Sequence, residues 1–257
     1  MQPGPIYFKA PRKCGLFGVM CEAVPWQVNY LIDEASEVGK GANTTVSYVH
    51  HYFQNDGLGE SNVHRHADNC MGQNNNNCFL WYLAWGALNH LHESIHYSFL
   101  IAGHTKFGPT RCFGIIKRSY KVSHVSSRYE FARTVKSSSV AGVNKAQHVG
   151  THGGKLIVPV YNWSTFLDHY FIKFPNIKKY NHFRFSREEP GKLYFKESST
   201  SPEQSFTLLK NPAVLPPAVL PPKLQPQGLS LERKQYFFRQ ICPFCKPGTK
   251  DLVAPAP

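Results

Sequence analysis

The sequence predicts an α/β fold in which strands and helices alternate. Apolar residues alternate with polar ones in segments such as 95–101, a period typical of a half-buried strand. In segments such as 46–53 they recur at helical spacing. The resulting order is strand, strand, helix, strand, helix, strand, helix. A chain of 257 residues with 42% hydrophobic content is long enough for one main core with a small satellite.

The first elements are two strands and a helix. Residues 14–24 and 28–33 are predicted strands joined at Pro25. Residues 39–41, Gly-Lys-Gly, break the chain before the helix predicted over 46–53.

A second strand-helix-strand series follows. Residues 62–68 form a short predicted strand, and the amide-rich run 69–77 is suited to capping the next helix. That helix, 79–91, is apolar nearly all round, so we expect it to be buried. The strand 95–101 then leads to a helix from Pro109, because proline is favoured in a first helical turn.

The rest of the chain changes in composition. Short aromatic strands are predicted at 156–161, 182–185 and 192–196, and a short helix at 229–240. Between them, the repeated unit Pro-Ala-Val-Leu-Pro predicts an extended polyproline-like stretch. We therefore expect four regions: a core (1–135), a small basic β-rich extension (136–200), a Pro-rich linker (201–228), and a short helix with a tail (229–257).

Positive charge is concentrated in one part of the chain. Residues 101–187 contain 15 Lys/Arg and two acids, Glu130 and Asp168, so this part accounts for the whole net charge of +13. A polyanion is the natural partner of such a segment, because phosphates neutralised by Lys and Arg release condensed counterions. A well-solvated surface is the alternative.

Seven scattered cysteines do not indicate a disulfide framework, and we expect reduced thiols inside a cell. The Cys242-Pro-Phe-Cys245 motif supplies two of the four ligands that a structural zinc ion needs, so we interpret it as a chance spacing. No apolar stretch is long enough to span a bilayer, and no secretory leader is visible.

The most specific string for chemistry is His-Ala-Asp68-Asn-Cys-Met-Gly-Gln-Asn, which places a carboxylate at the end of a strand beside amide side chains. Nucleases that use two metal ions gather several carboxylates around Mg²⁺ or Mn²⁺. Asp68 alone is not sufficient for that. Asp33 and Glu34 are candidate substitute acids, and His64 and His66 share a strand face with Asp68, but solvated or packed side chains are the plainer interpretation.

Several ordered strings resemble a domain-of-unknown-function family of animal transposon-derived proteins. The strings are QPGPIYF (2–8), PRKCGLFGV (11–19), LIDEA (31–35), GKGAN (39–43), HADNCMGQN (66–74), GHTKF (103–107), CFG (112–114) and HFRF (182–185). The resemblance implies an RNase H-like core similar to that of DDE-type transposases and integrases: a mixed sheet flanked by helices.

The resemblance also implies a damaged catalytic set. Asp68 matches the second acid of the family, which would make it a metal ligand, whereas Thr110 stands where the third acid is expected. The first acid lies on a strand upstream of the QPGPIYF string, so we expect the first strand to be missing and its neighbours to be unpaired. Arg65 departs from the family too, because it stands within a strand where an apolar residue is usual.

The site residues leave alternatives open. Asp68 is either a metal ligand or a loop residue that accepts hydrogen bonds from its own backbone. The candidate nucleic-acid contacts are basic residues near aromatic ones, which offer cations to phosphates and rings to bases: Lys117, Arg118, Lys178, Lys179, Arg184 and Arg187.

We therefore expect a degenerate DDE-type nuclease or transposase-like protein that binds DNA non-specifically, with cleavage weak or lost. Any metal would be Mg²⁺ or Mn²⁺, and the resemblance implies a nuclear location, with the cytoplasm as the other possibility. The alternative is a host-recruited protein-interaction module without a nucleic-acid role. An unstable fragment without function is a third hypothesis.

Overall fold

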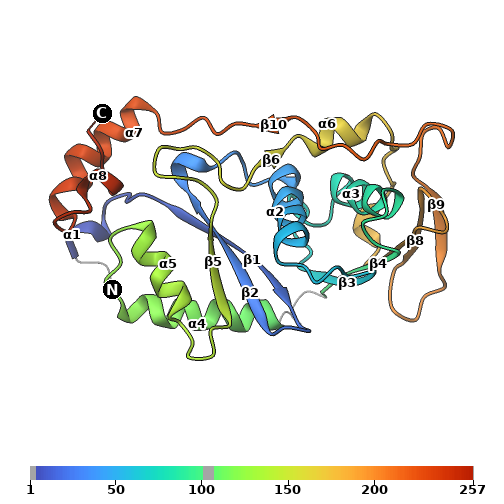
Figure 1. Ribbon diagram of the computed structural model, residues 1–257, viewed down its shortest axis with the longest axis horizontal. Helices are drawn as coiled ribbons and strands as arrows, with labels where there is room; N and C mark the ends of the chain where they lie inside the picture. Colours follow the sequence, from blue (N-terminus) through green and yellow to red (C-terminus); the bar gives the residue numbers. More distant parts are fainter. Residues whose placement is uncertain (1–3, 101–106, 257) are drawn as a thin grey trace. The chain divides into compact units, whose positions relative to one another are not determined.

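Two mixed β-sheets with flanking helices dominate the computed structural model, which describes residues 4–100 and 107–256. The predicted α/β class is confirmed. The chain divides into two compact units: unit 1 contains residues 4–38, 107–159 and 225–256, and unit 2 contains residues 39–100 and 160–224 (Figure 1). The four consecutive regions expected from composition do not coincide with these units, because each unit combines segments that are distant in the sequence. Residues 101–106, with the end of the predicted strand 95–101 and most of the GHTKF string, lie outside the described chain.

Unit 1 is built on a three-stranded sheet. Strands β1 (Cys14–Cys21) and β2 (Trp26–Asp33) are antiparallel, and β5 (Asn144–His148) pairs with β2 in parallel, which gives the order β1-β2-β5. Helices α4 (Gly108–Val122) and α5 (Arg128–Lys136) pack against this sheet (Figure 1). Their apolar residues meet Leu31 of β2 in a small core: Ile116, Ala132 and Val135.

The C-terminal segment of the chain also belongs to unit 1. It contains α7 (Leu231–Tyr236), the π-helical turn η3 (Phe237–Ile241), η4 (Cys242–Phe244) and α8 (Lys250–Val253). Phe237, Ile241 and Ala254 form its own buried cluster. The remaining short helices of unit 1 are α1 (Gly4–Tyr7) and η1 (Glu34–Ser36).

Unit 2 is built on a five-stranded sheet of order β3-β4-β7-β8-β9. Strands β3 and β4 are parallel and the other pairs are antiparallel. The strand bounds are Asn62–Ala67 for β3, Ser94–Phe99 for β4, His182–Ser186 for β7, Lys192–Lys196 for β8 and Gln204–Thr207 for β9. Alternate residues are buried along β4, β7 and β8, so one face of the sheet belongs to the core.

Helices α2 (Ala42–Asn55) and α3 (Asn77–Leu88) supply the centre of unit 2. Helix α3 is buried from Cys78 to Ala87, as its all-round apolar sequence predicts. Helix α6 (Trp163–Asp168) packs on α2 and α3, and β6 (Val160–Tyr161) pairs with β10 (Lys223–Leu224). The turn η2 spans Ile177–Lys179.

The elements predicted over the first half of the chain all occur, with shifted ends. The first strand stops at Cys21 rather than residue 24, and the helix predicted over 79–91 runs from Asn77 to Leu88. The strand predicted over 156–161 shortens to Val160–Tyr161, because the N–H groups of Ile157 and Val158 both donate to the carbonyl of Val149.

The Pro-rich stretch up to residue 224 belongs to unit 2 and is not extended throughout, contrary to the prediction: the N–H of Val214 donates to the carbonyl of Asn211 at 3.0 Å in a turn. The carbonyl of Pro217 accepts a hydrogen bond of 2.9 Å from Nε1 of Trp85. Pro216 and Pro221 are buried. Strand β9, which lies within the region assigned to a linker, is the edge strand of the larger sheet.

All seven cysteines are free thiols. In the part of the chain that the structure describes, no helix combines the length and apolar character needed to cross a membrane.

Candidate nucleic-acid interface

Asp68 follows the last residue of β3 and is exposed. Its Oδ1 accepts hydrogen bonds from the backbone N–H of Cys70, at 3.3 Å, and from Nδ2 of Asn74, at 2.6 Å. A carboxylate that bonds the backbone two residues ahead organises a turn. The contacts of Asp68 are therefore those of the loop-residue interpretation.

Asn74 connects this turn to the core of unit 2. It is buried, and its Oδ1 lies 3.5 Å from Nη2 of Arg65, while its backbone carbonyl accepts a bond of 3.1 Å from the hydroxyl of Tyr97. The amide-rich run after β3 thus fixes the loop on the sheet, and Asn76 caps α3 by accepting from the N–H of Phe79.

The donors around Asp68 do not fit a two-metal site. Among the residues that the structure describes, no three His, Cys, Asp or Glu side chains are grouped so that they could hold a metal ion. Oδ1 of Asp68 accepts hydrogen bonds from the amide nitrogen of Asn74 and from the backbone N–H of Cys70, and these N–H donors do not bind metal ions. We therefore derive no chemical step through a metal at this position.

The other predicted acid position, Thr110, lies in the first turn of α4 in unit 1 and is exposed. Lys117 and Arg118 lie on the same helix and are exposed too. The buried face of α4 carries Cys112 and Ile116. The three predicted site residues of α4 are thus surface residues of a different unit from Asp68.

The five-stranded sheet of unit 2 has a polar face opposite its buried one. Its side chains project at every second position of four neighbouring strands. We define this polar face by His64, His66, His96, Ser98, His182, Arg184, Tyr194 and Lys196; all eight are exposed or partly exposed.

The register aligns these residues in two rows across the strands. The first row is His64, His96, Arg184 and Tyr194, and the second is His66, Ser98, His182 and Lys196. In the first row the rings of His64 and His96 stack with centroids 4.5 Å apart and planes 7° apart. The guanidinium of Arg184 lies 4.0 Å from the centre of the Tyr194 ring. In the second row, Oγ of Ser98 lies 2.9 Å from Nδ1 of His182.

Two histidines of the polar face, His96 and His182, favour their neutral form. Partial burial lowers the pKa of His96, and the charges of His64 and Arg184 lower it further. Partial burial also lowers the pKa of His182, with a contribution from Lys196. At neutral pH these rings are therefore flat, uncharged surfaces with polar edges.

Arg184 supplies a cation that is already paired. Its Nη2 and Nε lie 2.6 and 3.3 Å from the two carboxylate oxygens of Glu203. The hydrogen bond and charge of Glu203 raise the pKa of Arg184 although partial burial opposes the shift. An incoming phosphate would have to compete with Glu203 for this guanidinium.

The remaining predicted cations lie in the same unit, outside the two rows. Lys178 and Lys179 belong to the turn η2, and Arg187 follows β7; all three are exposed. Nζ of Lys179 lies 3.7 Å from a carboxylate oxygen of Glu197, in a solvent-exposed ion pair that is worth little.

From the sequence, Arg184 was predicted to contact nucleic acid. His64 and His66 were interpreted as packed or surface residues, or as conceivable metal ligands. Five residues of the polar face were missed: His96, Ser98, His182, Tyr194 and Lys196. Apolar and polar residues alternate over 94–99 and 192–196, and this alternation could have revealed them. The apolar positions were interpreted as core, whereas the polar positions between them were given no role. Pairing of β4 with β7, 84 residues apart at Ser98 and His182, is what brings these polar positions together.

No curated protein and no solved structure matches this chain. One family model matches residues 11–201, which is most of the sequence and includes Asp68 and the whole polar face. The chain therefore belongs to the family described as Domain of unknown function (DUF7869).

Proposed function

We propose that this chain is a transposon-derived, RNase H-like protein that binds nucleic acid through the polar face and has lost efficient cleavage of phosphodiester bonds. The observation that supports it most is the row His64, His96, Arg184 and Tyr194, which presents stacked rings and a cation on an accessible sheet surface. Planar side chains stack on bases, and cations bind phosphates.

The chemistry of this surface favours single strands over duplexes. Unpaired bases expose the faces that His64 and Tyr194 could stack on, whereas bases within a duplex are covered by their neighbours. Ser98, His182 and Lys196 offer polar contacts in the second row. We therefore expect sequence-indifferent binding of single-stranded DNA or RNA that weakens with salt.

The RNase H-like part of the proposal is supported by the order of elements. An antiparallel pair (β1, β2), a helix (α2) and a parallel pair (β3, β4) separated by a helix (α3) follow one another, as the resemblance implies. A nuclear location follows from the same ancestry and is part of the proposal.

Loss of cleavage is supported by the surroundings of Asp68. Asp68 is a single carboxylate engaged in turn hydrogen bonds, and residues 4–100 and 107–256 do not group around it the further acids that two-metal hydrolysis requires. The test is nicking of supercoiled plasmid in Mg²⁺ or Mn²⁺ by the wild type and by Asp68→Asn, which retains the acceptor that orders the turn. We expect no difference; nicking that disappears in Asp68→Asn would overturn this part.

Binding is tested by fluorescence anisotropy with labelled 20-nucleotide single-stranded DNA, RNA and duplex DNA at two salt concentrations. We expect His64→Ala and Tyr194→Ala each to weaken single-strand binding by about fivefold or more, since one stacking contact contributes about 1–3 kcal/mol. The control is Lys223→Ala, which removes an exposed lysine of unit 2 on β10, outside the polar face. Equal affinities in all four proteins would refute the proposed surface.

The same experiment separates the protein-interaction alternative. A folded wild-type protein without measurable affinity for any of the three nucleic acids would favour that alternative. Replacing Lys178, Lys179 and Arg184 together by Ala tests the wider basic region, and we expect a smaller salt dependence in this variant.

A further inference from the structure

Unit 1 contains a cavity of about 590 Å³ that the proposed nucleic-acid surface does not use. Ligand pockets for small organic molecules commonly measure about 300–1,000 Å³. The start of β1, the second half of α4, the loop before α5 and the C-terminal segment line the cavity. All of its lining residues belong to unit 1.

Most of the wall is apolar. Phe113, Ile116 and Phe131 contribute one part from α4 and α5, and the C-terminal segment contributes Ile241, Phe244 and Val253. Three of these six are aromatic rings. An apolar ligand body would therefore lose contact with water and gain dispersion contacts over much of its surface.

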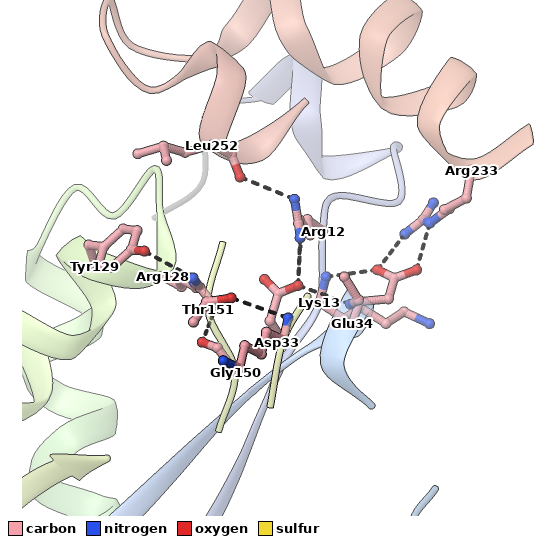
Figure 2. A network of polar contacts seen from close by, with 12 residues as sticks. Arg12, Lys13, Asp33, Glu34, Arg128, Tyr129, Gly150, Thr151, Arg233 and Leu252 are labelled. Carbon is pink, nitrogen blue, oxygen red and sulfur yellow. Dashed lines mark hydrogen bonds and ion pairs between the residues drawn. The ribbon is translucent and has the colours of Figure 1, made fainter. Parts of the chain in front are cut away.

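The polar part of the wall has an excess of positive charge. It includes Arg12, Lys13, Lys117 and Arg128, whereas Asp33 is the one carboxylate among the lining residues. Figure 2 shows that Asp33 is occupied by Arg12, whose Nη2 and Nε lie 2.6 and 3.1 Å from Oδ1. The charge of this acid is therefore compensated before any ligand binds.

Arg128 is the cation best placed for an anionic group. Its Nη1 donates to the carbonyl of Gly150 at 2.7 Å and its Nη2 to the hydroxyl of Tyr129 at 2.9 Å (Figure 2). Both acceptors are neutral, and no carboxylate of the described chain forms an ion pair with this guanidinium. Arg128 is also the first residue of α5; the carboxylate in that first turn, Glu130, accepts hydrogen bonds from the N–H of Ser126 and from Nζ of Lys246.

We infer that this cavity is a binding site for an amphipathic monocarboxylate, with the apolar body between α4, α5 and the C-terminal segment and the carboxylate at Arg128. An apolar wall, a rim with surplus cations and a guanidinium with only neutral acceptors together favour this class over neutral or cationic molecules. The inference is independent of the nucleic-acid proposal, because it uses no residue of unit 2.

The probe is 11-(dansylamino)undecanoic acid, whose emission rises when its apolar body leaves water. We expect saturable one-to-one binding by the full chain, displacement by dodecanoate, and displacement by dodecan-1-ol at least fivefold less effective. Equal displacement by the acid and the alcohol would refute the role of the carboxylate. No saturable signal at 100 µM probe would refute the site.

Two variants locate the site. Arg128→Gln should weaken probe binding by about fivefold or more, and Val125→Trp, which adds a large side chain to the lining loop, should abolish it. Arg133→Gln is the matched control on the same helix, because its side chain is 78% exposed and does not line the cavity. Unchanged binding in both variants, each with a normal melting transition, would overturn the inference. If Arg128→Gln does not fold, the role of charge is tested instead by Lys117→Gln and by the comparison of the acid with the alcohol.

Discussion

Oδ1 of Asp33 lies 2.6 Å from Nη2 of Arg12, and only 6% and 10% of the two side chains are exposed. The same Oδ1 accepts from the N–H of Ala35, and Nη1 of Arg12 donates to the carbonyl of Leu252 at 3.1 Å (Figure 2). This pair thus ties the end of β2, the residues before β1 and the C-terminal segment together.

Asp33→Asn should lower the free energy of unfolding by about 2–4 kcal/mol, because it leaves the guanidinium of Arg12 buried without a counter-charge. Urea denaturation followed by circular dichroism measures the change. Glu197→Gln is the control, since Glu197 belongs to an exposed ion pair and its loss should cost less than about 1 kcal/mol. Equal stabilities of wild type and Asp33→Asn would show that the Arg12–Asp33 pair contributes nothing.

Unit 2 should lose stability in mild acid because of His50. This residue is 3% exposed and lies among aromatic rings, including Tyr82, whose hydroxyl is 3.2 Å from Nδ1, and Trp163, at 5.2 Å between ring centres. Burial lowers the pKa of His50 to about 4. Below pH 6.5 the unfolded chain takes up a proton that the folded chain does not, so stability is complete above pH 6.5 and falls as the pH decreases toward 4.

The expected loss from His50 between pH 7 and pH 5 is about 2 kcal/mol. Urea unfolding at the two pH values should show this difference in the wild type, and the difference should shrink by that amount in His50→Gln. The comparison of pH slopes removes the effect of the substitution on stability at neutral pH. Parallel slopes would mean that His50 protonates equally in both states.

The C-terminal segment should loosen in acid before the rest of unit 1 unfolds. Its Arg233 lies 2.7 Å from Glu34, and its Lys246 lies 3.1 Å from Glu130. Burial raises the pKa of both carboxyls, but hydrogen bonds outweigh it and the net shift is downward. Glu34 accepts these bonds from Arg233 and from the N–H of Lys13. Glu130 accepts them from the N–H of Ser126 and from Lys246. A depressed folded-state pKa means that this stabilisation is present above about pH 4.5 and is lost as the pH falls through the folded pKa.

Glu34→Gln imitates this protonation at pH 7. Hydrogen exchange of residues 231–254 should accelerate by about tenfold, equivalent to about 1.4 kcal/mol, while β2 and α5 stay protected. Glu232→Gln, an exposed position on α7, is the control and should leave exchange unchanged. If Glu34→Gln exchanges like the wild type, the ion pair with Arg233 does not hold the segment.

The local spacing of apolar residues was sufficient to predict the helices and strands that have strong apolar patterns. The all-round apolar helix α3 and the alternating strands β4, β7 and β8 were predicted because their side-chain patterns depend only on which face is buried. Strand β5, with the sequence Asn-Lys-Ala-Gln-His, has no such pattern. It is a strand because its backbone pairs with β2, a long-range effect that local sequence does not report.

The polar face and the unit 1 cavity depend even more than β5 on contacts between segments that are distant in the sequence. Asp68 was identified from its own string, and its turn hydrogen bonds involve residues within six positions. The polar face needs β4 beside β7, and the unit 1 cavity needs α4 and α5 beside a C-terminal segment more than 100 residues away. A net charge of +13 indicated a polyanion but gave no indication that Glu203 pairs with Arg184.

Arg65 places a guanidinium within β3, beside the aromatic rings of unit 2. The group lies 4.2 Å from the centre of the Phe79 ring and 5.3 Å from that of Tyr97, and burial lowers its pKa. Its Nη1 is buried without a hydrogen-bond partner among the described residues. The cost of removing this charge from water is therefore only partly offset by the rings and by the long contact to Asn74.

Arg65→Met should keep the contacts with Phe79 and Tyr97 and remove the desolvated charge, so unit 2 should be equally stable or more stable by about 1–2 kcal/mol. Arg65→Ala should instead destabilise it by about 2–3 kcal/mol, since truncation leaves a cavity beside the rings. Urea denaturation of the three proteins distinguishes packing from charge. If Arg65→Met loses as much stability as Arg65→Ala, the cation itself, through its attraction to the rings, is what holds β3 on α3.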